Sequence, residues 1–246
     1  MFRQPALIVA PHPDDETLGC GGTIALKRRA GADVTIVFVS DGTASHAGRI
    51  DEPALREMRR GEARAAGATL GVVADRLVFL GLPDGHLRSE QAALADRLAE
   101  LIGQSAARQV FAPYRHDTTD DHVVVHAAAR SAVGRAGRGV TLYEYPVWFW
   151  RRWPWSSSRG RGLRGALRNA KDARLWWRAL SRDFSDGIDI REVLDTKRRA
   201  LACHASQMTR HGGDGDWPIL ADVAGGTFLE CFFEGIEPLA VRQPIE

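Results

Sequence analysis

Polar residues crowd together directly after the first apolar segment of the sequence. Residues 6–9 (ALIV) have the length and β-branching of a buried strand, and residues 10–19 (APHPDDETLG) follow it. The polar run therefore lies at the carboxyl end of a strand, where ligands bind in open α/β sheets. One histidine and three carboxylates lie within five residues. Like charges so close together make it unfavourable for all of the carboxylates to be ionised at once, unless a cation neutralises them. A divalent metal ion would supply that charge.

Strand and helix signals alternate along the first 145 residues. Apolar runs predict strands over residues 6–10, 33–40, 76–80, 109–113 and 141–145. The segments between them predict helices over 16–29, 52–67, 89–104 with Ser89 as its cap, and through His126 to about 136. This alternation predicts an α/β fold with a Rossmann-like, doubly wound, mostly parallel sheet. A later helix over 190–207 and a final strand over 227–233 complete the prediction.

The composition is that of one folded unit. With 246 residues, 44% hydrophobic and 26% charged, residues 1–246 fit a single domain with an insertion over 147–184. A formal net charge of +2 gives no reason to expect a nucleic-acid partner. Three cysteines without a CxxC pair argue against a disulfide scaffold, and the first apolar run is too short for a signal or membrane span. We therefore expect a soluble, cytoplasmic protein.

The expected insertion, residues 147–184, is rich in tryptophan and arginine. It holds six of the seven tryptophans. Tryptophan usually serves packing, which favours a lid or capping segment on the sheet edge. A platform for a sugar ring and a peripheral membrane surface are the alternatives.

A second polar cluster, residues 114–122 (YRHDTTDDH), follows the strand expected at 109–113. A catalytic zinc needs a few N/O ligands and an open position, and His12, Asp14 or Asp15, and His122 could supply three of them. The pattern leaves open which aspartate binds. His122 and His126 have the spacing of zincin ligands, but the glutamate of that motif is missing, so we interpret His126 as a helix-face residue.

Simpler interpretations of these segments exist. Taken alone, Asp117 or Asp120 is better explained as a cap of the following helix, favoured by its macrodipole. Gly19, Gly21 and Gly22 permit close packing of a helix on the sheet, but a dinucleotide fingerprint would need its glycines directly after the strand. The sequence contains no GxSxG elbow and no P-loop.

The segment 11–19 (PHPDDETLG) resembles the signature of the LmbE/PIG-L zinc-dependent N-deacetylases. Counterparts of the family's weaker motifs follow in the expected order, namely Arg59 with Glu62, Leu70-Gly71, Asp84-Gly85, Asp121-His122, and a late segment with Lys197, Leu201, His204, Ser206 and Gln207. The resemblance implies a Rossmann-like sheet and hydrolysis of an N-acetyl group, usually on an N-acetylglucosamine conjugate, to acetate and a free amine. Lipid-linked and nucleotide-linked conjugates are among the substrates to consider.

Residue roles follow from this resemblance position by position. It implies that His12, Asp15 and His122 bind one zinc ion and that Asp14 is the general base. Arg59 becomes a substrate-binding candidate, although a solvated ion pair with Glu62 at helical spacing is an equal alternative.

This chain departs from the family pattern at one position. Thr119 and Asp120 stand where the family has histidine and proline, so the oxyanion-stabilising histidine is missing. We predict that His116 replaces it as a catalytic residue, held in its charged form by Asp117 or Asp121, with Tyr114 as second choice.

Two rival functions remain. One is a zinc amidase that acts on a different acylated small molecule. The other is a catalytically inactive descendant that binds a glycan, although a binding module would have no need of a base beside metal ligands.

Overall fold

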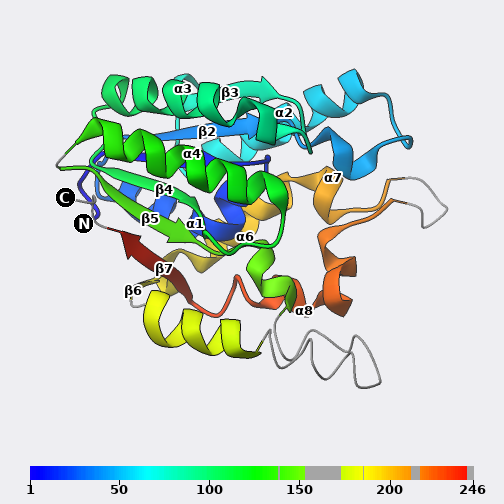
Figure 1. Ribbon diagram of the computed structural model, residues 1–246. Coiled ribbons are helices and arrows are strands. Elements are labelled where there is room, and N and C mark those ends of the chain that lie inside the picture. Colours follow the sequence, from blue (N-terminus) through cyan, green and yellow to red (C-terminus); the bar gives the residue numbers. More distant parts are fainter. Residues whose placement is uncertain (138, 153–172, 185, 212–216, 243–246) are drawn as a thin grey trace.

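A seven-stranded sheet with helices on both faces forms the centre of the molecule (Figure 1). The computed structural model describes residues 1–137, 139–152, 173–184, 186–211 and 217–242. The strands are β1 (Ala6–Ala10), β2 (Val34–Ser40), β3 (Leu77–Leu82), β4 (Gln109–Pro113), β5 (Thr141–Tyr145), β6 (Asp186–Asp189) and β7 (Ile236–Arg242). The main helices are α1 (Asp15–Arg29), α2 (Glu52–Thr69), α3 (Gln91–Gln104), α4 (Asp120–Ala136), α6 (Leu194–Cys203), α7 (Ala205–Met208) and α8 (Thr227–Glu230).

The strand order is β3-β2-β1-β4-β5-β7-β6, and β1 to β5 are parallel. The predicted doubly wound, mostly parallel α/β fold is therefore confirmed. The order reverses between β1 and β4, which places the loops after these two strands side by side. Such a switch point is where open α/β sheets bind ligands.

The two faces of β1 pack into two separate apolar cores. Ala6, Ile8 and Ala10 belong to the core under α1, α2 and α6, whereas Leu7 and Val9 belong to the core under α3 and α4. This alternation follows from the two-residue period of a strand. Because both faces are covered, the strand is apolar throughout, and polar side chains that could meet a ligand follow only beyond its carboxyl end.

Glycines allow α1 to lie close on its neighbours, as the sequence suggested. A β-carbon at Gly19 would come within 2.1 Å of the Tyr145 ring, and one at Gly22 within 2.4 Å of the Ile190 side chain. The amino-terminal turns of α1 therefore approach β5 and the segment before α6 more closely than any larger residue permits.

The carboxyl-terminal part differs from the prediction. The strand predicted over 227–233 is wrong, because Thr227–Glu230 is α8, and Phe228 and Phe232 place their buried rings one helical turn apart. The last strand is β7, which begins after Gly235 (φ 85°) and runs antiparallel to β5 and β6.

Two helix predictions are also corrected in detail. The helix predicted over 190–207 is divided into α6 and α7 at His204, whose ψ of 59° is not helical. Ser89 does not cap α3, since its hydroxyl donates to the carbonyl of His86 (3.2 Å) within a preceding turn.

Only part of the tryptophan-rich segment 147–184 is described. Trp150 and Trp176 are buried against the core, whereas Trp177 is exposed. Trp153 and Trp155 lie outside the described residues, and a lid function for this segment stays a prediction. Within the described ranges, no helix is long and apolar enough to cross a membrane.

A buried ion pair joins α6 to β7 and α1. Lys197 Nζ donates to Glu237 Oε1 and to the carbonyl of Leu18, both at 2.8 Å, and both charged side chains are almost fully buried. Glu237 also accepts from the main-chain N–H groups of Gly22 and Thr23. The pair fixes the carboxyl-terminal strand and the late helix to the start of α1.

We predict that Lys197→Met lowers the free energy of unfolding by about 3–5 kcal/mol, because it leaves the Glu237 carboxylate buried without its cation. Urea denaturation measures this change. Arg191→Met, which breaks the exposed pair of Arg191 with Asp189, is the control and should change stability little. Equal effects of the two substitutions would contradict the assigned role of the buried pair.

Candidate metal centre

Three side chains meet at the switch point between β1 and β4. His12 lies in the loop after β1, Asp15 opens α1, and His122 lies in the first turn of α4. Asp15 Oδ2 lies 3.2 Å from His12 Nδ1 and 3.2 Å from His122 Nε2. The three potential ligand atoms lie within 4.8 Å of one another, which fits a single metal ion.

Each of the two histidines meets a second carboxylate on its other nitrogen. His12 Nε2 lies 3.0 Å from Asp84 Oδ1 and 3.5 Å from Asp121 Oδ2. His122 Nδ1 lies 2.9 Å from Asp117 Oδ2. Carboxylates in this position fix the orientation of metal-ligating imidazoles and raise their basicity. The arrangement therefore has the outer carboxylates of a metal site as well as the ligands.

Asp117 is itself held in place by the main chain. It accepts hydrogen bonds from the N–H groups of Val147 (3.3 Å) and Trp148 (3.1 Å) after β5. The interpretation of Asp117 as a cap of α4 is therefore wrong, and the N-cap residue Thr119 makes no side-chain cap bond. Asp120, in contrast, is exposed in the first turn of α4.

The electrostatics of the cluster favour a cation. Burial lowers the pKa of His122, but Asp15 and Asp117 outweigh it and raise the pKa to about 9. Burial likewise opposes the charge on His12, yet Asp121, Asp15 and Asp84 raise its pKa well above the usual value. His122 Nε2 is buried, and although Asp15 Oδ2 lies 3.2 Å away, no described residue makes a well-oriented hydrogen bond with it. A metal ion would supply both the positive charge and the missing partner, so the donor set fits one.

Asp14 lies next to the cluster but has different partners. Its backbone φ of 123° lies in a region that residues other than glycine rarely adopt. Burial raises the pKa of its carboxyl to about 7, although the Arg59 guanidinium opposes this shift. A carboxylate that titrates near neutral pH is suited to accepting and releasing protons.

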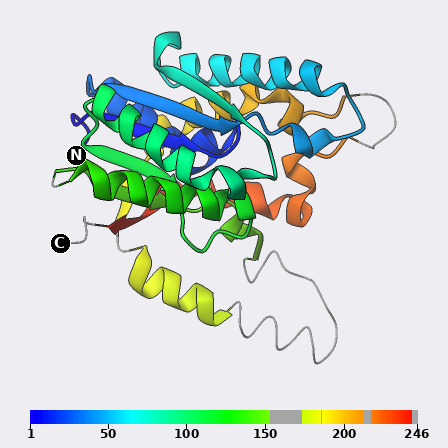
Figure 2. The ribbon, with the colours of Figure 1, turned by 45° about the horizontal axis from the view of Figure 1, so that its top comes forward.

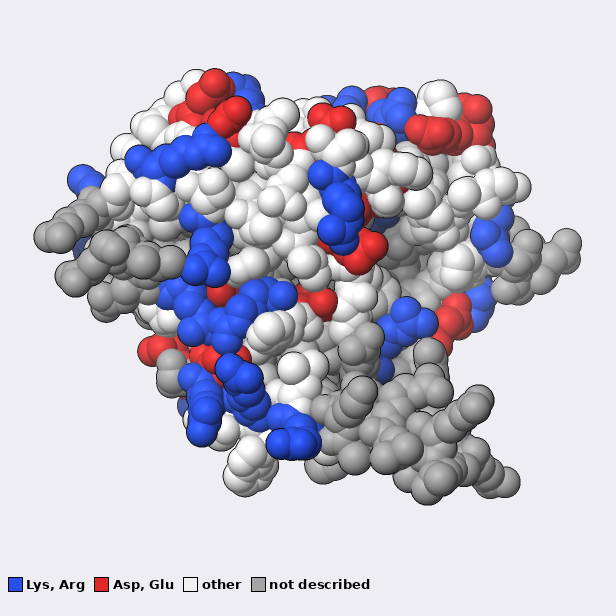
Figure 3. All heavy atoms as spheres, viewed as in Figure 1, with Lys and Arg blue, Asp and Glu red and all other residues white. Residues whose placement is uncertain are grey.

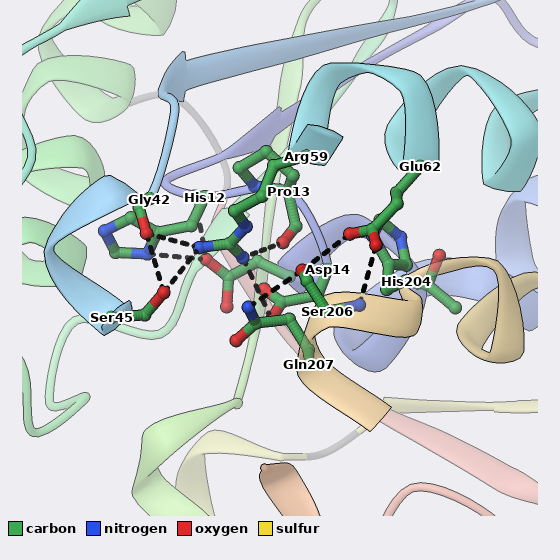
Figure 4. Close-up of polar contacts among 12 residues, drawn as sticks. His12, Pro13, Asp14, Gly42, Ser45, Arg59, Glu62, His204, Ser206 and Gln207 are labelled. Atoms are coloured by element: carbon green, nitrogen blue, oxygen red, sulfur yellow. Dashed lines mark hydrogen bonds and ion pairs between the residues drawn. The ribbon is translucent and has the colours of Figure 1, made fainter. Parts of the chain in front are cut away.

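Arg59 and Glu62 on α2 brace two different segments (Figure 4). The Arg59 guanidinium donates to the carbonyls of Pro13 and Gly42 and contacts Asp14 Oδ2 at 3.3 Å. Glu62 accepts from the N–H (2.6 Å) and hydroxyl (2.7 Å) of Ser206 in α7. The alternative of a solvated Arg59–Glu62 ion pair is therefore wrong.

Arg59 is buried, and its contacts within the protein are those of a positioning residue. It holds the loop that carries Asp14. A direct substrate contact by Arg59 stays a prediction.

His204, between α6 and α7, supports the same loop from the other side. Its Nε2 lies 2.8 Å from Glu16 Oε1, and Glu16 Oε2 accepts from the main-chain N–H of Asp14 at 2.9 Å. Both His204 and Glu16 are fully buried. The late motif thus acts through Glu16 on the backbone of Asp14.

A polar hollow of about 450 Å³ lies beside the metal cluster, in the range of small-molecule sites. It is lined by the loops after β2 and β3, with charged and polar side chains that include Asp41, Thr43, Glu52, Arg56, Asp84 and His86. Asp84 belongs both to this hollow and to the surroundings of His12. Through Asp84, the hollow adjoins the Nε2 side of the His12 ring, while His12, Asp15 and His122 are not among its lining residues.

His116 is not brought to the cluster. The His116 side chain is exposed, and its ring makes a T-shaped contact with the Tyr114 ring. Its Nε2 accepts a hydrogen bond from Arg115 Nε. Burial and the charge of Arg115 lower its pKa. Asp117 and Asp121, expected to hold it charged, contact His122 and His12 instead. A catalytic role of His116 stays a prediction, and none of these contacts supports it.

The other residues of the second polar cluster also have structural partners. Tyr114 is buried and donates to Asp183. His126 is buried, and its Nδ1 is hydrogen-bonded to the carbonyl oxygen of Pro113 (3.1 Å), as expected of a helix-face residue that is not a ligand.

Sequence reasoning missed the carboxylates behind the histidines. Asp84 follows β3 in an Asp-Gly turn at the same sheet edge as His12, and Asp117 precedes His122 by five residues. The sequence shows that Asp84 and Asp117 are polar residues after the carboxyl ends of strands. It does not show that Asp84 contacts His12 and that Asp117 contacts His122.

The fold and the cluster define a Rossmann-like α/β protein with a His/Asp group that could hold a metal ion at the switch point of its sheet. The family model described as "PIG-L: GlcNAc-PI de-N-acetylase" matches residues 7–133, about half of the chain and all of the metal cluster. The chain belongs to this family.

Known relatives and solved structures agree with this assignment. The chain is 29% identical to a 1D-myo-inositol 2-acetamido-2-deoxy-alpha-D-glucopyranoside deacetylase from Rhodococcus jostii, over 95% of this chain and 91% of the relative. It is 31% identical to a 2'-N-acetylparomamine deacetylase from Streptomyces fradiae, over 58% of this chain and 57% of the relative. The structure of N,N'-diacetylchitobiose deacetylase from Pyrococcus horikoshii has the same fold, with a TM-score of 0.69, 18% identity, and coverage of 98% of this chain and 84% of that one.

We predict that Asp117→Asn lowers the affinity for a divalent ion by roughly 10- to 100-fold, because His122 loses the carboxylate that orients it. Competition with a chelator measures the affinity. Asp120→Asn, in the nearby first turn of α4 and with the same change of charge, is the control and should have no effect. If both variants bind the ion as tightly as the unaltered protein, Asp117 has no part in the site.

Proposed function

We propose that this protein is a zinc-dependent hydrolase that removes the N-acetyl group from a small amino-sugar conjugate and releases acetate and a free amine. The observation that carries the proposal is the convergence of His12 Nδ1 and His122 Nε2 on Asp15 Oδ2, with the Asp14 carboxylate alongside. The names of the relatives support the substrate class, since all three act on N-acetylated amino sugars.

His12, Asp15 and His122 would hold the ion. Bound zinc supplies Lewis-acid activation of an acyl carbonyl and lowers the pKa of water. Asp14, with its pKa near 7, accepts a proton from the attacking water and passes it to the departing nitrogen. Arg59 and Glu16 contact the loop that carries Asp14 from two sides and so support the position of its carboxylate.

The polar hollow between the β2 and β3 loops favours a hydroxylated conjugate over an apolar one, because its lining offers several charged hydrogen-bonding groups. We also propose a cytoplasmic location. Its support is that Cys20, Cys203 and Cys231 are all unpaired, as expected in a reducing compartment.

Acetate release from N-acetylated substrates by the zinc-loaded protein tests the function directly. Free, inositol-linked, nucleotide-linked and lipid-linked N-acetylglucosamine should be compared with an acylated molecule that is not a sugar. Release from the last compound alone would favour an amidase of another kind. Binding without release would favour the inactive glycan-binding alternative.

We predict that His12→Ala, Asp15→Ala and His122→Ala each lose bound zinc, whereas Asp14→Asn keeps it. Asp14→Asn should nonetheless lower kcat on the order of a hundredfold or more, the scale of general-base catalysis. Elemental analysis alongside kinetics measures both. If Asp14→Asn loses zinc while Asp15→Asn retains it, the roles of the two carboxylates are exchanged.

The group that stabilises the developing oxyanion is open to a separate test. Thr119 occupies the family histidine position, and its buried hydroxyl has no hydrogen-bond partner in the described part of the chain. We propose that this hydroxyl donates to the substrate oxygen. Such a donor is worth roughly a hundredfold in kcat.

We therefore expect Thr119→Ala to lower kcat substantially, while His116→Ala, on an exposed side chain, leaves it nearly unchanged. Zinc content and thermal stability serve as controls for both variants. The reverse result, with a low kcat only in His116→Ala, would restore His116 as the replacement for the family histidine. Thr119→His should then recover part of the lost rate.

A further inference from the structure

A helix outside the metal cluster presents an unusual surface. Residues 173–178 are helical and continue into the π-helical turn η5 (Ala179–Asp183) just before β6. Trp176 and Ala179 face the core, and Asp183 accepts from the Tyr114 hydroxyl at 2.7 Å. One side of the helix is thus firmly attached to the protein.

The opposite side combines large apolar residues with arginines. Trp177 is 77% exposed and Leu180 is 46% exposed. Arg174, Arg178 and Arg182 follow at intervals of four residues, so they form a stripe beside these two side chains. We call this set of five residues the Trp/Arg ridge.

The arginines of the ridge carry uncompensated charge. None of the three makes a hydrogen bond or ion pair with another residue in the described part of the chain. The nearby Arg115 and Arg242 differ, because they pair with Asp183 and Glu144. The ridge therefore presents three positive charges without a counterion among the residues that the structure describes.

A shallow hollow of about 420 Å³ lies along the ridge. Its lining consists of Arg174, Leu175, Trp177, Arg178, Ser181 and Arg182 and contains no acidic side chain. Guanidinium groups bind phosphate oxygens strongly, often through two parallel hydrogen bonds. The hollow is thus suited to an anionic phosphate group.

The ridge lies at an outer margin of the molecule. In Figures 1 and 2 the helix (yellow) lies below the sheet and outside the layers formed by α1 to α4. Figure 3 shows Lys and Arg side chains gathered over the same part of this face. A convex, basic margin can approach a flat surface without obstruction from the rest of the described fold.

We propose that the Trp/Arg ridge docks the protein on an anionic phospholipid membrane. The arginines bind lipid phosphates, and Trp177 and Leu180 enter the interfacial region, where an aromatic ring and an apolar side chain are stable together. A nucleic acid would match the charge but offers no apolar phase for Leu180. A protein partner would need an interface of roughly 800 Å² per side, and two exposed apolar side chains are a small centre for one.

Sedimentation with vesicles tests this proposal without substrate or turnover, so its outcome is independent of the proposed deacetylase activity. The zinc-loaded full chain is mixed with vesicles of phosphatidylcholine alone, or of phosphatidylcholine and phosphatidylglycerol in equal parts. We expect binding to the anionic vesicles only, and weaker binding as salt is added.

Two sets of variants distinguish vesicle binding by the ridge from a general electrostatic attraction between the protein and the vesicle. Neutralising Arg174, Arg178 and Arg182 to glutamine should weaken binding roughly a hundredfold, since each basic residue near an anionic leaflet contributes a factor of about five. The matched control neutralises Arg64, Arg198 and Arg199, three exposed arginines on α2 and α6. This control should retain most of the binding, and thermal denaturation verifies that both proteins are folded.

The apolar contribution has its own measurement. Brominated lipids in the anionic vesicles should quench part of the tryptophan fluorescence, and Trp177→Phe should remove that part. The proposal is overturned if the unaltered protein ignores anionic vesicles or if both arginine triples lose binding equally. It is also overturned if the ridge arginines are needed for binding a nucleic acid while vesicles are not bound.

Discussion

Three consecutive carboxylates are buried where β1 passes into α1, and each is matched by a different cationic group. Asp14 meets Arg59, Asp15 lies between His12 and His122, and Glu16 meets His204. A buried charge without a partner is strongly destabilising, so this short segment requires all of these partners to be in place at once. The partners come from α2, from α4 and from the break between α6 and α7. The charge of one loop thereby determines where three distant elements dock.

This requirement explains why the late part of the chain reaches the site although it supplies no metal ligand. His204 ends α6 and directs its ring to Glu16, while Ser206 in the next turn donates to Glu62 on α2. The Lys197–Glu237 pair holds the same helix against α1. The late helix therefore stabilises the position of Asp14 from behind, through side chains that never need to contact a substrate.

Local signals in the sequence were sufficient for strands β1 to β5 and for naming the candidate site residues, but not for the carboxyl-terminal elements or for the partners of those residues. The strand over 6–10 and the polar run after it stand out because apolar and polar residues change abruptly there. Whether Asp14 or Asp15 faces the histidines could not be read from the pattern, because two adjacent residues at the start of a helix have no periodicity to distinguish them.

The role of Asp117 depends on a histidine one helical turn into α4 and on main-chain groups after β5, and such long-range geometry leaves no local trace. For the apolar run 227–233, a local pattern is present but does not distinguish a strand from a helix. Its residues suit a strand as well as a helix, and the glycines at 225, 226 and 235, all with positive φ, decide between the two by ending the elements around it.

The backbone at Asp14 is strained at a position to which we assign a proposed function. A residue other than glycine at φ 123° costs on the order of 1–3 kcal/mol, and the contacts of Glu16 and Arg59 with this loop are what maintain it. Glycine would relieve the strain but would remove the carboxylate. A selection for thermostability alone would therefore be expected to replace Asp14 first, so an aspartate here in a family member is a sign that its chemistry is still under selection.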